Sequence, residues 1–439
     1  RLGTNQSGEN FSLNTNVQIH KLLPKSWGIS VPVNLMMNSA TNTPKYFPGS
    51  DILVSEGNAP DSILTKSTGM NFSTSLAKSS KSDNKIIKYT LDKLKPSFSA
   101  SNSFSSNEIN KEVLNEKYSG SVSYSYPFRR DNYFTPFKWL KDVPWLGDKL
   151  GDMNVYYSPT AFNTSVKMNE TFSQTTKRVG ARSENYAFGL NRQFSLDYSL
   201  TDKLKTKYKR TITSDLKDSR GYAWIALKEM DPGVVEKINE TLNTSFNPQI
   251  FSWLKPNFSH NAAYSWNKPR ASTINGAKIT TQFRFSSSVN ILPSQIFELI
   301  YKPPTKSIKR PGSSRRRGRS KVKEEEIKET KPEQKENTFL TALHGIVKKV
   351  NPISISYTEN LNRMGYGVQG TVPTGYKFGW LPEHGLEHAD NIGSDLGSWD
   401  HKRDFSIRSG LNFTRNISTS MKYAQNISTT IGASNIQQR

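Results

Sequence analysis

The stretch NYAFGLNRQFSLDYSLTDKLKTKYKRTIT, residues 185–213, decides the fold class, because large apolar side chains occupy almost every second position. In a helix this set would spread around the whole circumference, whereas successive side chains of a strand point to opposite faces. The pattern therefore predicts a β-strand with one apolar and one small or polar face, broken only at Arg192. The apolar positions are Tyr186, Phe188, Leu190, Phe194, Leu196, Tyr198 and Leu200.

A second strand follows after Thr201-Asp202-Lys203, which predicts a short turn. Its apolar face includes Leu204 and Tyr208, and lysines alternate with them at the odd positions. If Leu200 faces Leu204 across the turn, the register places Phe194 opposite Arg210 and Asp197 opposite Lys207. We expect Asp197 and Lys207 to be neighbours on the polar face, which also carries Lys205 and Lys209.

Two environments are possible for the apolar face: a second sheet, as in a β-sandwich, or lipid, as in a membrane barrel. Several alternating segments exceed the five to ten residues usual for sandwich strands. Outer-membrane strands need about 9 to 11 residues to cross the apolar layer. We therefore favour a wall whose polar face lines a lumen and whose apolar face meets the lipid bilayer, with Arg192 and Arg210 near the edge of a thin apolar band. The predicted lipid-facing residues are Tyr186, Phe188, Leu190, Phe194, Leu196, Tyr198, Leu200, Leu204 and Tyr208, and the predicted lumen-facing ones are Asp197, Lys205, Lys207 and Lys209.

Composition agrees with a sheet that is polar on one side. Hydrophobic residues make up only 34% of 439, yet aromatic residues reach 11%, and disordered chains are poor in these. No apolar run approaches the ~20 residues of a membrane-spanning helix. The absence of cysteine removes disulfide frameworks and thiolate metal sites. The formal net charge of +23 is partly local, because residues 306–323 contain nine Lys or Arg and no acid.

Alternating segments recur along most of the chain and predict thirteen strands of one antiparallel sheet. The fold class is all-β: a single segment, residues 1–439, of a very large antiparallel transmembrane β-barrel, with short helices in the connections. The chain begins Arg1-Leu2-Gly3, which suggests a fragment of a longer protein. The predicted strands cover residues 11–20, 27–38, 67–78, 88–105, 118–128, 155–173, 185–200, 203–214, 254–267, 278–292, 352–362, 403–415 and 417–431.

Three connecting segments have their own signatures. Residues 303–337 are highly charged and almost free of apolar side chains, so we expect a disordered loop between strands. Residues 338–350 predict a short amphipathic helix. Asp231-Pro232 followed by GVVEKINETL predicts a capped helix within the connection 215–253. Because consecutive strands are antiparallel, counting strands places the basic loop, residues 303–337, at the same end of the strands as loops 39–66 and 215–253. Loop 363–402 is expected at the opposite end.

The stretch KLLPKSWGISVPVNLMMNSATNTPKYFPGSDI, residues 21–52, resembles a recurrent block of the SprA (Sov) family. That block has Pro, Trp and Gly entering a strand, then Pro-Val, Pro-x-Tyr and an Asp. Similar blocks in the same order are FTPFKWLKDVPWL, PQIFSWLKPNFSHNAAYSW and LHGIVKKVNPISISYTENLNR. The chain departs from the family pattern at Met364-Gly365-Tyr366 and in the expanded PWLGDKLGDM. The matching family-motif positions are Pro24, Trp27, Gly28, Pro32, Pro44, Tyr46 and Asp51.

This resemblance implies the outer-membrane translocon of the type IX secretion system, which is linked in some bacteria to gliding motility. It implies a carboxy-terminal-half segment of a Gram-negative outer-membrane protein that exports folded cargo, with secreted cargo proteins and a PorV-like outer-membrane protein as partners. The same alternation would also suit another outer-membrane barrel, such as a porin or an LptD-like transporter, or a secreted β-rich adhesin.

Catalytic chemistry is not expected. HGLEH, residues 384–388, formally matches a zinc-binding pattern that requires two histidines on one helix, but Gly385 and the flanking loop-forming residues argue against a helix. The basic run could bind anionic headgroups or nucleic acid. However, residues 303–337 contain no aromatic side chain on which a base could stack, so we expect no nucleic-acid partner. We therefore expect no enzyme activity, no catalytic residue, no metal site and no cofactor.

Overall fold

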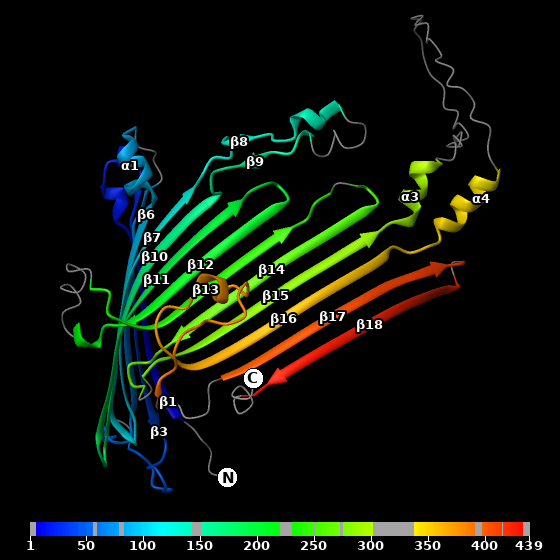
Figure 1. Ribbon diagram of the computed structural model, residues 1–439. Helices are drawn as coiled ribbons and strands as arrows, with labels where there is room; N and C mark the ends of the chain where they lie inside the picture. Colours follow the sequence, from blue (N-terminus) through cyan, green and yellow to red (C-terminus); the bar gives the residue numbers. More distant parts are fainter. Residues whose placement is uncertain are drawn as a thin grey trace, which may run out of the picture.

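The protein is built on a single large antiparallel sheet of 14 strands in the computed structural model (Figure 1). The structure describes residues 6–55, 59–78, 83–142, 151–219, 231–249, 251–272, 275–301, 338–390, 397–414 and 416–432. The strands, in sheet order, are β1 (Gln6–Gln18), β3 (Pro32–Pro44), β4 (Thr65–Ser75), β6 (Leu94–Ser106), β7 (Asn110–Pro127), β10 (Ala161–Lys177), β11 (Arg182–Ser199), β12 (Leu204–Asp215), β13 (Val234–Phe246), β14 (Leu254–Asn267), β15 (Ala277–Ile291), β16 (Ile353–Val368), β17 (Gly397–Asn412) and β18 (Ser418–Ile431).

Sheet order follows chain order without a crossover, and each strand runs antiparallel to the next. This is the up-and-down arrangement of a β-barrel wall, so the predicted fold class of an all-β barrel segment is confirmed. The sheet curves along its width, so that β1 and β3 lie out of the plane of β14 to β18 (Figure 1). Its strands range from 11 residues in β4 to 18 in β7 and β11.

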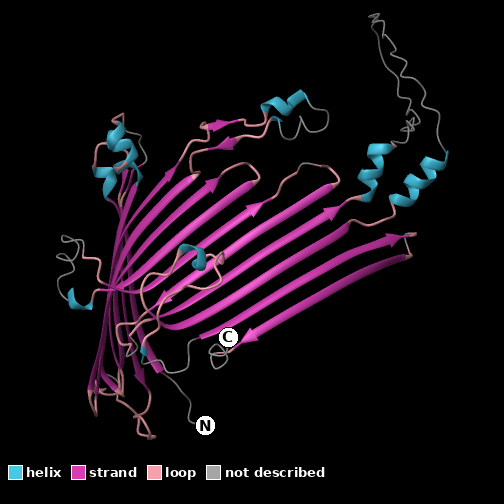
Figure 2. Ribbon diagram, in the orientation of Figure 1, coloured by secondary structure: helices cyan, strands magenta, loops and turns pink. Residues whose placement is uncertain are grey.

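The small elements lie in the connections (Figure 2). Two short strand pairs, β2 (Ile29–Ser30) with β5 (Ala77–Lys78) and β8 (Tyr133–Phe134) with β9 (Val155–Tyr156), extend beyond the main strands. The α-helices are α1 (Lys85–Tyr89), α3 (Pro293–Ile300), α4 (Thr338–Val347), where the sequence predicts a helix over 338–350, and α5 (Thr374–Lys377). The 3-10 turns are η1 (Ile19–Leu22), η2 (Lys25–Trp27), η3 (Leu91–Lys93), η4 (Lys138–Asp142) and η6 (Lys217–Ser219). No helix in the described ranges is long and apolar enough to cross a membrane.

One strand was missed by the sequence prediction. GVVEKINETL forms β13, paired with β12 and β14, and not a helix. Its inclusion raises the predicted thirteen strands to 14 and reverses the sidedness of every later loop. The connection from β15 to β16 therefore lies at the same end of the strands as the β11–β12 turn. The connections after β3, β12 and β16 lie at the opposite end. The predicted disordered segment 303–337 lies outside the described residues.

Candidate functional site

The two faces of the sheet differ in chemistry over its whole width. Register and alternation place Ser, Thr, Asn and Lys side chains of all 14 strands on one surface, here called the polar face. Hydroxyl and amide groups on neighbouring strands join across it: Ser119 donates to Asn169 (2.9 Å) and Ser354 to Asn290 (2.6 Å), and the Ser97 and Ser121 hydroxyls lie 2.7 Å apart. Such groups remain well hydrated and offer little apolar area to a passing molecule.

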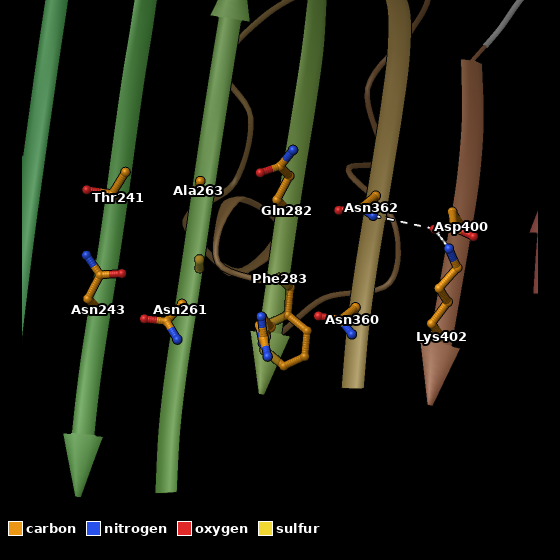
Figure 3. A pocket seen from close by; sticks show the side chains of 12 residues that line it. Thr241, Asn243, Asn261, Ala263, Gln282, Phe283, Asn360, Asn362, Asp400 and Lys402 are labelled. Atoms are coloured by element: carbon orange, nitrogen blue, oxygen red, sulfur yellow. Dashed lines mark hydrogen bonds and ion pairs between the residues drawn. The ribbon is translucent and has the colours of Figure 1, made fainter. Parts of the chain in front are cut away.

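The polar face is hollowed at several places. Figure 3 shows the depression over β13 to β17, which has a volume of about 470 Å³. A hydrogen bond of 3.5 Å links Asn362 to Asp400, and the Lys402 ammonium lies 3.8 Å from the same carboxylate. Besides Arg284, Asp400 and Lys402, the polar side chains of the lining are five amides and one hydroxyl: Asn243, Asn261, Gln282, Asn360, Asn362 and Thr241.

The predicted β11–β12 register is confirmed. Phe194 pairs with Arg210, Arg192 with Ile212, and Asp197 with Lys207. The Lys207 ammonium lies 3.2 Å from the Asp197 carboxylate. Since Lys205, Lys207 and Lys209 alternate along one strand, all three ammonium groups lie on the polar face with Asp197, and all three lysines are exposed.

The opposite surface, here called the apolar face, carries a cross-strand ladder of aromatic rings. Ring centroids are 6.0 Å apart for Tyr124 and Phe162, 5.2 Å for Phe162 and Phe194, and 6.1 Å for Phe194 and Tyr208. The predicted lipid-facing residues of β11 and β12 alternate onto this face, which includes Tyr186, Phe188, Leu190, Phe194, Leu196, Tyr198, Leu204 and Tyr208, and Leu200 follows directly after β11.

The structure corrects the prediction for Phe188 and Leu190. Leu216, just after β12, folds back onto the apolar face and forms a small cluster with them. Phe188 is 3% and Leu190 5% exposed. These two side chains therefore pack against the chain itself and are covered from any lipid, because the residue that follows β12 lies over them.

The chain after β16 also folds back over the apolar face, in front of β12 to β15 in Figure 1. This covering segment, residues 369–390, includes α5. The Lys377 ammonium lies 2.8 Å from the Glu240 carboxylate, with only 13% and 4% of the two side chains exposed. Tyr208 donates a hydrogen bond to Glu240 (3.0 Å), and the Arg210 guanidinium lies 3.8 Å from it.

A second ionic group interrupts the apolar face at β16 and β17. The Glu359 carboxylate lies 2.7 Å from the His401 imidazole and 3.6 Å from the Arg403 guanidinium, and it accepts a hydrogen bond from Tyr357 (3.2 Å). Sequence reasoning assigned no role to Glu240 or Glu359. The available signal was an acidic residue at an apolar position of an alternating strand, which demands a partner.

The family-motif residues lie at the ends of the first strands and not on either face at mid-wall. Pro24 precedes the turn η2, Trp27 is its last residue, and Gly28 follows it with a left-handed φ of 58°. Pro32 and Pro44 begin and end β3, Tyr46 pairs with Leu53, and Asp51 lies in the same loop. The structure therefore places these motif positions where strands start and stop.

HGLEH lies in the covering segment outside any helix or strand, and Gly385 has a left-handed φ of 62°. The His384 and His388 rings are 5.3 Å apart and line a depression of about 600 Å³ with Arg363, Tyr376 and Trp399. Burial lowers the pKa of His384, and the nearby His388 lowers it further. Among the described residues no group of three or more His, Cys, Asp or Glu could hold a metal ion.

Comparisons with known proteins give a distant likeness in structure. No family model matches the chain, and no curated protein matches it. Among solved structures, the chain is similar to the crystal structure of BamA from Haemophilus ducreyi lacking POTRA domains 1-3. The identity is 7% over 98% of this chain and 71% of that chain, with a TM-score of 0.26. A likeness of this strength supports no conclusion about function.

Proposed function

We propose that this chain forms part of the wall of a large outer-membrane β-barrel that conducts folded proteins out of a Gram-negative cell. The observation that carries the proposal is the polar face, a continuous surface of Ser, Thr, Asn and Lys across 14 antiparallel strands. A passing protein meets few apolar side chains there and has little to adhere to. Passage of a protein would depend on the width of the pore and the hydration of its wall, and no covalent step is required.

The apolar face supplies the other half of the argument. Strands of 11 to 18 residues are long enough to cross the apolar layer of a bilayer, which takes about 9 to 11 tilted residues. Pairing within the sheet satisfies the backbone groups that lipid cannot. Exposed side chains on this face, such as Phe98, Val122 and Val166, suit contact with acyl chains.

The width of the sheet bears on what can pass. Adjacent strands lie about 4.8 Å apart, so 14 strands form an arc of about 60 Å. In the proposed pore further strands complete the wall between β1 and β18. Together with the SprA-like sequence blocks, this supports a type IX secretion translocon, with secreted cargo proteins and a PorV-like protein as proposed partners.

The absence of cysteine from the chain allows a direct test of the two faces. Val166 and Lys167 are adjacent in β10 and alternate between the faces. In the full-length protein in vesicles, we expect Lys167→Cys to react with a water-soluble maleimide. A fluorophore on Val166→Cys should be quenched by brominated lipid. Equal water access at both positions, in a protein soluble without detergent, would support an adhesin instead.

Transport is tested separately by deleting the full-length gene and measuring extracellular cargo. We expect cargo to accumulate inside the cell and complementation to restore its export. Normal export by the deletion strain would contradict the translocon assignment while leaving the membrane-barrel assignment standing. A full-length chain that closes with few additional strands would favour a porin-sized or LptD-like barrel.

A further inference from the structure

The charges of the sheet are divided unequally between its two faces. Register and alternation assign each regularly paired strand residue to one face. Thirteen basic residues lie on the polar face: Lys95, Lys117, Lys167, Lys205, Lys207, Lys209, Lys237, Lys255, Lys278, Arg284, Lys402, Arg408 and Lys422. The acidic residues there, within the described strands, are Asp197, Asp215, Asp400 and Asp404.

The apolar face is close to neutral by the same assignment. Its basic residues are Lys66, Arg182, Arg192, Arg210, Arg363 and Arg403, and its acidic residues are Glu9, Glu112, Glu116, Glu170, Glu184, Glu240 and Glu359. The positive charge of the strands is therefore concentrated on the polar face and is not a uniform property of the sheet.

Most of this charge has no local acid to neutralise it. Two of the polar-face acids have basic neighbours there, Asp197 with Lys207 and Asp400 with Lys402, and Asp215 lies 3.7 Å from the guanidinium of Arg270, outside the strands. Alternate residues of a strand are about 6.7 Å apart, which is less than the Debye length of about 10 Å at 0.1 M salt. The fields of Lys205, Lys207 and Lys209 therefore overlap at this salt concentration.

We infer that the polar face is an electropositive surface that favours anions, so that the pore it lines accepts folded proteins with acidic surfaces more readily than basic ones. The inference rests on the proposed function, because it assigns a charge preference to that same lumen. Fixed charge of one sign along a hydrated wall raises the local concentration of the opposite sign. Serine and asparagine side chains keep the wall hydrated, while the lysines give it a preference for anions.

The test is ion selectivity of the full-length protein in planar bilayers under a potassium chloride gradient. At about 0.1 M salt we expect Lys205→Glu/Lys207→Glu/Lys209→Glu to shift the reversal potential toward potassium. The matching Lys→Gln triple variant should shift it about half as far, since it removes half as much charge. At about 1 M salt the Debye length falls to about 3 Å and the shifts should shrink.

A control of equal charge change lies outside the wall. Lys21 lies in η1, Lys85 begins α1 and Lys348 directly follows α4, and all three are exposed. Their triple change to Glu should leave the reversal potential unchanged. An equal shift in this control, or none in the β12 variants, would overturn the inference while the pore remains. A protein that forms no conducting pore would refute the proposed function instead.

Cargo choice gives the second readout. Two reporters with the same export signal and fold, one with an acidic and one with a basic surface, are compared in cells. We expect the acidic reporter to be exported faster by the wild-type protein, and the advantage to fall in the Lys→Gln variant. Equal export of both reporters, with a measurable anion preference, would limit the inference to small ions and contradict its statement about cargo.

Discussion

Glu240→Ala should release the covering segment from the apolar face. The change leaves Lys377, whose side chain is only 13% exposed, without the carboxylate 2.8 Å away. Removing one partner of a buried ion pair costs about 3–5 kcal/mol. The Lys377 ammonium keeps a contact with the Tyr264 ring at 4.9 Å, so we take the lower end of this range, about 3 kcal/mol. This corresponds to a shift of about 100-fold in the docking equilibrium.

The assay is the labelling rate of a cysteine that is covered only while the segment is docked. Ala389 is small and 3% exposed, so Ala389→Cys should react slowly in the otherwise wild-type protein. We expect labelling about 100-fold faster with Glu240→Ala. The matched control is Arg210→Gln, because the Arg210 side chain is 43% exposed and its guanidinium lies 3.8 Å from Glu240, and it should change the rate less than about fivefold. Unchanged labelling of the Glu240→Ala protein would refute the view that this pair holds the segment.

Three further predictions concern single sites. Gly379→Ala should destabilise the docked state of the covering segment by about 1–3 kcal/mol, because φ is +81° and an added Cβ would lie 2.5 Å from the Phe283 ring. We expect faster labelling of Ala389→Cys, and unchanged labelling would contradict this prediction. Asp197→Asn should change the free energy of unfolding by less than about 1 kcal/mol, because its partner Lys207 is exposed and Asp197 itself is half-buried. A larger loss in urea unfolding would show a buried role. Because burial lowers the pKa of His384, the docked segment binds its proton less well than the free one. Labelling of Ala389→Cys, measured relative to an exposed cysteine at the same pH, should therefore speed up as the pH falls below about 6.5, and an imidazole titrating above that value would contradict this.

The β11–β12 hairpin could be predicted from the sequence because its information is local. Alternation identifies the faces and a short turn fixes the register, so the pairing of Asp197 with Lys207 followed without knowledge of the rest of the chain. Buried Phe188 and Leu190 could not be distinguished from their exposed neighbours, because Leu216 covers them from outside the pattern. The position of the covering segment over the apolar face could not be predicted from local periodicity either.

β13 was missed for a related reason. Its apolar-face positions include Glu240 between Ile238 and Leu242, and this acid breaks the alternation that marks a strand. With Pro232 just before it, the sequence fitted the start of a helix better. Glu240 is tolerated there because Lys377, from a connection far along the chain, neutralises it. One long-range ion pair therefore concealed the strand and, through the strand count, reversed the predicted sides of the later loops.

Charged residues on the apolar face are the main objection to a lipid environment, since a mid-membrane charge on the lipid face costs about 2–4 kcal/mol. Several of these charges have protein partners that lower this cost. Arg192 donates to Ser214 (2.7 Å), Glu170 accepts from Tyr186 (2.8 Å), and the groups around Glu240 and Glu359 pair internally. This idea can be tested with Tyr186→Phe, which removes the hydrogen-bond partner of Glu170. We expect the variant to fold less stably in lipid than the wild-type protein. If it weakens folding no more in lipid than in detergent, this part of the face does not meet acyl chains.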